Sequence, residues 1–165
     1  MIFRLSFILF LFAYGTSSAQ KQPLAITFQQ AEKQGVTIAK LDSTYKSAVD
    51  ANPEKAVFKS PAGQKDLQAA YGDLLAELQK HLAANGFKWE KPTRCFNRIY
   101  FAPEGKIDYF LYNFIPKPSD PNPISEEKRI KFEKLLSSFI KNYQFKLSAD
   151  VKFAQCSPVT YSDLN

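Results

Sequence analysis

The spacing of the apolar residues changes near Arg94, from helical repeats to strict alternation, and divides the chain into a helical half and a mixed half. Before that point, leucines and a tyrosine recur at helical spacing from about Gln64 to Ala84, and Asn85-Gly86 ends the pattern. After it, Arg94–Phe101 and Lys106–Phe114 alternate and are rich in aromatic and β-branched residues. A chain with helices first and a hairpin, a helix and a strand afterwards is typical of the α+β class.

Two shorter helices are expected upstream of the long one. Thr27-Phe28-Gln29-Gln30 fits a capping box, so one helix starts there and stops at Gly35. A second starts at Thr37, and helical spacing continues through Tyr45 to Val49. The segment Gln20–Ile26 is polar and is expected to be a flexible lead.

The two alternating segments predict a β-hairpin. Ala102-Pro103-Glu104-Gly105-Lys106 reads as a type I turn with Gly105 in the left-handed conformation. That turn sets a register in which Tyr100 faces Asp108 and Arg98 faces Phe110.

The remainder predicts a loop, a helix and a strand. Four prolines make Ile115–Pro123 a stiff loop, and Ser125 caps a helix with acidic residues in its first turn. A strand is expected near Val151–Cys156. The buried stripe of the helix is expected to comprise Phe132, Leu135, Leu136, Phe139 and Tyr143. Together the elements predict N-terminal helices followed by hairpin, helix and strand in a small, mainly antiparallel sheet.

The first residues have the three parts of a secretory signal peptide. Arg4 gives a positive start, Leu5–Tyr14 is apolar, and Gly15–Ala19 is small, with Ser17 and Ala19 where a signal peptidase reads. The apolar run is shorter than the roughly 20 residues that span a bilayer. We therefore expect a signal peptide at 1–19 and a secreted or periplasmic mature chain without a transmembrane span.

The remaining chain is expected to be one α+β domain at 20–165, with a helical part at 27–86 and a hairpin–helix–strand part at 94–161. Export bears on its two cysteines, since an oxidising compartment favours pairing. Cys95 and Cys156 are therefore candidates for a disulfide, and the alternative is two free thiols packed as small apolar side chains.

The density of aromatic residues is the most unusual feature of the hairpin. In the register above, one face holds Phe96, Arg98, Tyr100, Asp108, Phe110, Tyr112 and Phe114. The other holds Cys95, Asn97, Ile99, Phe101, Ile107, Tyr109 and Leu111. Two apolar faces indicate either helices on both sides or an exposed aromatic platform, which is typical of a partner site. If one face meets solvent, the first is the better candidate, because Arg98, Tyr100, Asp108 and Tyr112 carry polar tips suited to a ligand or peptide.

Catalytic and cofactor signatures are sparse. One histidine and two cysteines supply too few ligands for a usual zinc enzyme, and haem, Cys-x-x-Cys and phosphate-loop motifs do not occur, so no cofactor is predicted. His81 flanks the stripe of the long helix without a nucleophile signature. Glu90, Glu104 and Asp108, near Trp89, are the carboxylates that a glycoside hydrolase could use.

The chain is basic, with 22 Lys and Arg against 16 Asp and Glu and a net charge of +6. Its lysines are spread along the predicted helices, whereas a nucleic-acid site needs them clustered on one face. No nucleic-acid partner is predicted, and the charge favours solubility or attraction to an anionic envelope surface.

Three stretches resemble a family of small exported proteins of Gram-negative cell envelopes: Phe96–Phe101, Gly105–Tyr112 and Phe153–Val159. In outline, 94–161 also resembles the periplasmic C-terminal domain of TonB-type energy transducers, through Gly105-Lys106-Ile107 and Tyr143-Gln144-Phe145. The chain departs from the transducers in its signal peptide, which replaces their membrane anchor, and in having no long Pro-rich spacer. The resemblance implies a non-enzymatic envelope role.

These observations predict an exported, non-catalytic binding or adaptor protein, whose aromatic hairpin face contacts an envelope protein or peptide. A small carboxylate-dependent hydrolase acting on envelope glycans is the alternative, and a structural protein without a specific ligand is a third reading.

Overall fold

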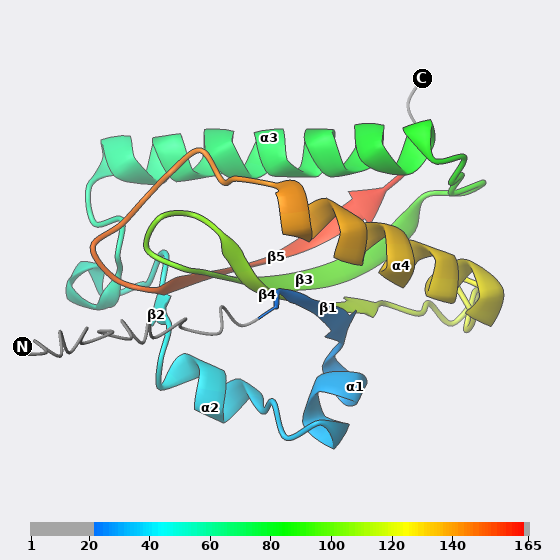
Figure 1. The fold of residues 1–165 in the computed structure, drawn as a ribbon, viewed down its shortest axis with the longest axis horizontal. Helices are drawn as coiled ribbons and strands as arrows, with labels where there is room; N and C mark the ends of the chain where they lie inside the picture. The colour runs from blue at the N-terminus through cyan, green and yellow to red at the C-terminus, as the bar shows by residue number, and fades with distance from the viewer. Residues whose placement is uncertain (1–21, 164–165) are drawn as a thin grey trace, which may run out of the picture.

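The computed structural model describes residues 22–163, so the predicted signal peptide at 1–19 lies outside the described residues. Its fold is α+β, as the sequence predicts (Figure 1). The elements in chain order are β1 Leu24–Thr27, α1 Phe28–Lys33, α2 Ile38–Asp42, β2 Lys46–Ser47, a 3₁₀ turn Pro53–Lys55, α3 Pro61–Ala84, β3 Thr93–Phe101, β4 Ile107–Phe114, α4 Glu126–Asn142 and β5 Phe153–Tyr161.

The strands of the described residues form one five-stranded sheet in the order β1-β4-β3-β5-β2. The three central strands, β4, β3 and β5, pair antiparallel, and the short outer strands β1 and β2 pair parallel to their neighbours. The prediction of a mainly antiparallel sheet is therefore confirmed for its centre. The predicted flexible lead is wrong in part, because Leu24–Thr27 pairs with Tyr109–Tyr112 as β1.

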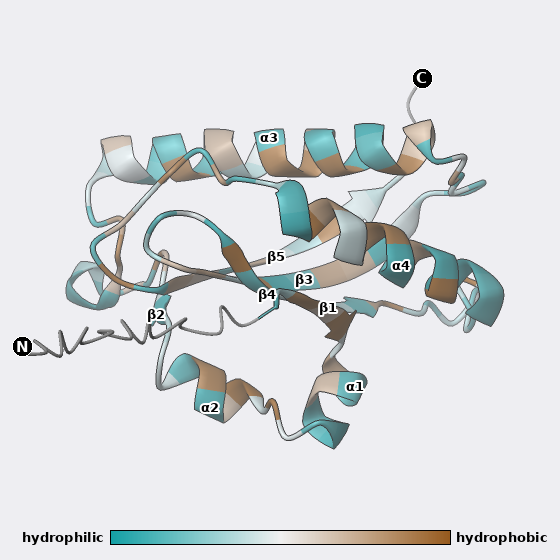
Figure 2. Ribbon diagram, in the orientation of Figure 1, coloured by the Kyte–Doolittle hydropathy of each residue, from teal (hydrophilic) through white to brown (hydrophobic). Residues whose placement is uncertain are grey.

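Helices cover both faces of this sheet. Figure 1 shows α3 and α4 on one side and the small helices α1 and α2 on the other. The larger core lies under α3 and α4, whose apolar residues turn toward the strands (Figure 2). A smaller core lies under α1 and α2 and includes Tyr45, Tyr100, Tyr109 and Leu111. Of the two readings of the hairpin, helices on both sides is the one that the structure adopts.

The helix starts follow the sequence signals closely. Thr27 and Gln30 form a capping box, and Thr37 and Ser125 accept hydrogen bonds from backbone N–H groups of the helices that they begin. The long helix begins earlier than expected, at Pro61 after the cap Ser60. The continued helix through Tyr45 and Val49 is wrong, because α2 ends at Asp42 and the chain turns into β2.

The hairpin turn forms as predicted, with Gly105 at φ +88°. Its register is confirmed only next to the turn, where Phe101 pairs with Ile107. Asp108 has no partner on β3, since the next pair is Tyr100 with Tyr109. This β-bulge shifts the rest of β4 by one residue, so Arg98 pairs with Leu111 and not with Phe110.

The candidate disulfide does not form, and both cysteines are free thiols. Cys95 pairs with Val159 and Cys156 pairs with Arg98, which places the two an odd number of positions apart in the β3–β5 ladder. Because side chains alternate between the faces of a sheet, they point to opposite sides. Cys95 is buried in the larger core, whereas Cys156 is exposed.

No helix within residues 22–163 combines the length and the apolar character that a membrane crossing requires.

Candidate functional site

The shifted register divides the four predicted binding residues between the two faces of the sheet. Arg98 and Tyr100 lie on the side covered by α1 and α2, and Asp108 contacts Tyr45 on that same side. Tyr112 belongs to the larger core under α3 and α4. The structure thus brings three of the four together and separates the fourth.

Of the two readings of the hairpin, the exposed aromatic platform does not form, and the prediction that its aromatic face contacts a partner is wrong. Tyr100 and Tyr112 are both 0% exposed, and Tyr109 is 5% exposed. Covering helices remove the aromatic rings from solvent on either side, so the rings form core. What remains accessible near them is the polar rim made by Arg98, Asp108 and their partners.

Arg98 forms an ion pair with Asp42, the last residue of α2. Its Nη2 lies 2.5 Å from Asp42 Oδ1, and the hydroxyl of Tyr100 donates to the same oxygen at 3.5 Å. The guanidinium carbon also lies 5.7 Å from the centre of the Tyr100 ring. Burial raises the pKa of Tyr100, and the nearby Asp42 raises it further while Arg98 lowers it. This group ties α2 to the sheet.

Asp108 is at the centre of a second polar group. Its Oδ2 accepts a 2.7 Å hydrogen bond from Tyr45 Oη and lies 3.4 Å from Lys152 Nζ. Lys152 Nζ is also 5.2 Å from the centre of the Tyr45 ring. Burial raises the pKa of Tyr45, and the hydrogen bond to Asp108 adds to this effect. Tyr45 is therefore protonated at neutral pH and acts as a donor to the carboxylate.

A cleft of about 750 Å³ opens beside Asp108, between the hairpin turn and the C-terminal end of α4. A smaller pocket of about 260 Å³ lies under α2 and is lined by Tyr45 and Tyr109. Asp108 and Lys152 line both hollows, so this ion pair stands at their junction. The cleft by itself falls within the size range of pockets that bind small ligands.

The wall of the cleft is held by backbone hydrogen bonds between the hairpin turn and the α4–β5 connection. Phe145 N–H donates to Gly105 O at 3.0 Å, and Ala149 N–H donates to Pro103 O at 2.9 Å. The side chain of Gln144 also donates to the carbonyl of Glu104. These bonds give the cleft a preformed shape that does not depend on a ligand.

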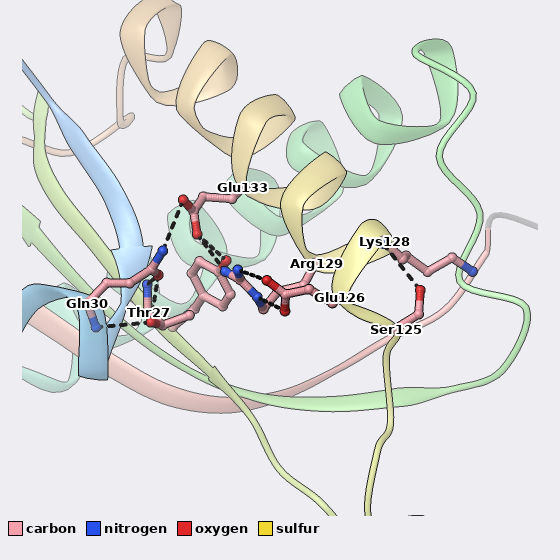
Figure 3. A network of polar contacts seen from close by, with 8 residues as sticks. Thr27, Gln30, Ser125, Glu126, Lys128, Arg129 and Glu133 are labelled. Atoms are coloured by element: carbon pink, nitrogen blue, oxygen red, sulfur yellow. Dashed lines mark hydrogen bonds and ion pairs between the residues drawn. The ribbon is translucent and has the colours of Figure 1, made fainter.

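Tyr112 belongs to a separate hydrogen-bond network on the other face of the sheet. Its hydroxyl donates to Glu133 of α4 at 3.0 Å. The same carboxylate accepts from Arg129 at 3.0 Å and from Gln30 of α1 at 3.3 Å (Figure 3). Arg129 in turn binds Glu126 with two nitrogens, at 2.7 and 2.5 Å. Burial raises the pKa of Tyr112, and Glu133 raises it further. The network fastens α4 to β4 and α1, which is a structural role.

The three carboxylates considered for hydrolysis do not form one site. Glu90 precedes β3 and pairs with Lys128 at 2.7 Å, whereas Glu104 in the turn and Asp108 in β4 lie at the other end of this nine-residue strand. Such a strand spans about 30 Å, far more than the roughly 5–9.5 Å between the carboxyl groups of a glycosidase. Trp89 is 3% exposed and stacks on Tyr161 in the core.

His81 is half-buried between α3 and α4, where its Nε2 lies 2.9 Å from Ser138 Oγ. Residues 22–163 contain no cluster of three or more His, Cys, Asp or Glu side chains that could hold a metal ion.

Sequence reasoning missed the partners that complete the site. Tyr45 fits the helical spacing of α2, so nothing local distinguishes it from a stripe residue. Asp42 and Lys152 are single charges far from the hairpin in sequence, and only the tertiary fold places them beside Arg98 and Asp108.

Comparison of the chain with family models, with curated proteins and with solved structures finds no match in any of the three. The resemblance of 94–161 to the TonB-type transducer domain stays a prediction from the residues.

Proposed function

We propose that this chain is an exported, non-catalytic binding or adaptor protein of the cell envelope, and that it binds through the cleft beside Asp108. Export is inferred from the signal-peptide pattern of residues 1–19. The main support for a binding role is that a cleft of about 750 Å³ and a pocket of about 260 Å³ are both lined by the Asp108–Lys152 ion pair.

The chemistry of this junction favours binding over catalysis. Asp108 Oδ2 already accepts hydrogen bonds from Tyr45 and Lys152, which fix the carboxylate in place. Tyr45 has a raised pKa and keeps its proton at neutral pH, which makes it a poor base. Both groups suit the orientation of a ligand, and the tyrosines behind them supply a rigid floor.

The proposed contact surface is therefore the rim of the cleft and not the aromatic rings of the hairpin. Alanine at Tyr100 or Tyr112 would empty a fully buried volume, at a cost of about 3–5 kcal/mol, so a loss of binding in either variant would not separate a lost contact from a weakened fold. An exposed residue in the cleft wall is the better position for a variant.

The test uses Asn142→Trp, which places a large ring in the cleft wall at the end of α4, where Asn142 is exposed. Gln29→Trp is the control, because Gln29 is an exposed amide of α1 that lines neither the cleft nor the pocket beneath α2. A component recovered from an envelope extract by wild type and Gln29→Trp, but lost by Asn142→Trp, supports the proposal once it binds the purified chain. Equal recovery by both variants would place binding elsewhere.

A glycan hydrolase is the second candidate, because Glu104 and Asp108 line the same cleft. It predicts release of reducing ends from envelope glycans by the wild-type chain and none by Glu104→Gln. Activity that survives Glu104→Gln and Asp108→Asn alike would remove this candidate.

A further inference from the structure

The side chains that line the cleft carry more positive than negative charge, which favours ligands that carry negative charge. Three lysines line it, Lys106, Lys141 and Lys152, against two carboxylates, Glu104 and Asp108. Lys152 and Asp108 are paired with each other at 3.4 Å. Within the described part of the chain, Lys106 and Lys141 have no hydrogen bond or ion pair through their side chains, and both are exposed. The unpaired charge of the cleft is therefore two cations against the single carboxylate of Glu104.

The rest of the wall is apolar or carries amide groups. Ile107 and Ile140 are almost fully buried beneath the cleft, and Pro103 and the ring of Tyr143 line it at half exposure. Asn142 donates its amide to Ser138 O, which leaves its side-chain oxygen available as an acceptor. Such a wall suits a ligand that has both apolar side chains and backbone N–H donors.

We propose that the cleft binds an acidic segment of a polypeptide, with Asp or Glu side chains on Lys106 and Lys141 and an apolar side chain over the Ile107–Ile140 floor. This inference rests on the proposed binding function and names its ligand class. The concave shape favours a chain segment over a flat lipid surface, and the amide and apolar groups favour a peptide over a polyphosphate.

The experiment measures fluorescence anisotropy with three labelled peptides of the same eight-residue pattern, in which the variable positions are all Glu, all Gln or all Lys and two leucines stay fixed. The cleft variant is the double exchange Lys106→Glu and Lys141→Glu. The matched control is Lys65→Glu with Lys134→Glu, two exposed lysines of α3 and α4 outside the cleft that make the same change in net charge.

We expect the Glu peptide to bind about tenfold more tightly than the Gln peptide, because it forms two exposed ion pairs and each strengthens binding about threefold. The cleft variant should weaken the Glu peptide about tenfold or more, since attraction becomes repulsion at two positions, and the control should change the Kd less than about threefold. Raising the salt concentration should reduce the difference.

Three outcomes would overturn the inference. If the Gln or Lys peptide binds as tightly as the Glu peptide and Asn142→Trp blocks it, the cleft binds ligands but does not select acidic ones, and only the proposed function survives. Equal weakening by both double variants would show a general charge effect. Binding of anionic vesicles or of an oligonucleotide through Lys106 and Lys141, with no peptide bound at millimolar concentration, would assign the cleft to another class of ligand.

Discussion

Replacement of Gly105 by alanine tests whether the hairpin turn is locked against the α4–β5 connection. Gly105 has a φ of +88°, and a Cβ built on it would lie 2.8 Å from both Phe145 O and Leu147 O. Neither contact is with a flexible side chain, so the two backbone segments must separate. Gly86→Ala is the matched control, because Gly86 also has a positive φ, +65°, yet its Cβ would have nothing within 4 Å.

Both substitutions place alanine in a left-handed backbone conformation, but only Gly105→Ala also creates a steric clash with the α4–β5 connection. A left-handed alanine costs about 1–2 kcal/mol, and both variants have this cost. Gly105→Ala additionally displaces the turn from the connection and weakens the 3.0 Å bond from Phe145 N–H to Gly105 O. A buried backbone group that loses its partner costs about 1–3 kcal/mol. We therefore expect Gly105→Ala to lower the free energy of unfolding by about 2 kcal/mol more than Gly86→Ala does.

Urea unfolding of the purified chain, followed by circular dichroism, measures this difference, with unchanged m-values as the condition for comparison. Ligand binding in the cleft should weaken together with stability in Gly105→Ala, because the turn forms the cleft wall. Equal losses of stability in the two variants would mean that the turn does not pack on the connection, and the preformed cleft would be refuted with it.

Three further predictions concern buried side chains. In the folded chain, one thiol should react with a thiol reagent, because Cys156 is exposed while burial raises the pKa of Cys95 to about 12. Two thiols should react after unfolding. If the cysteines formed a disulfide, none would react before reduction. Burial raises the pKa of Tyr71 to about 12, above its ordinary value of 10.0, although Asn97 and Ser157 lower it in part. The protonated Tyr71 contributes fully to the free energy of unfolding below pH 10, and this contribution is lost between pH 10 and 12 because the unfolded chain ionises first. In urea titrations, Tyr71→Phe should therefore lose about 2–3 kcal/mol less stability than the wild type over this pH range. Parallel pH profiles of the two proteins would contradict this. Tyr112→Phe should lower the free energy of unfolding by about 1–2 kcal/mol in the same urea titrations, because Glu133 loses a hydrogen-bond donor. The same substitution made in a Glu133→Gln variant should lower it less.

The elements that the sequence predicted well are those whose signals are local. The capping residues Thr27 and Ser125 each accept from an N–H group three residues later, and the turn at Gly105 depends on its own backbone angle. The strands β1 and β2 have no such signal. Leu24–Thr27 is extended because it pairs with a strand more than eighty residues later, and a four-residue segment shows too little alternation to reveal this.

The candidate site was predicted in part for the same reason. Arg98, Tyr100 and Asp108 were found because they share the hairpin, which is local. Tyr112 was assigned to the wrong face because one bulge, which nothing in the turn sequence announces, reverses every later position of β4. Tyr45 and Lys152, which complete the site around Asp108, reach it only through tertiary packing.

The bulge that defeated the predicted register also creates the site. In a regular strand, successive side chains point to opposite faces, so Asp108 and Tyr109 could not both meet Tyr45. A bulge allows this, and the structure shows it: Tyr45 Oη donates to Asp108 at 2.7 Å, and its ring centre lies 6.2 Å from that of Tyr109. Because Asp108 is the residue without a partner on β3, it can stand where the cleft and the pocket meet and hold Lys152 there. The irregularity in the ladder thus also shapes the proposed binding cleft, which agrees with the tendency of bulges to lie beside functional sites.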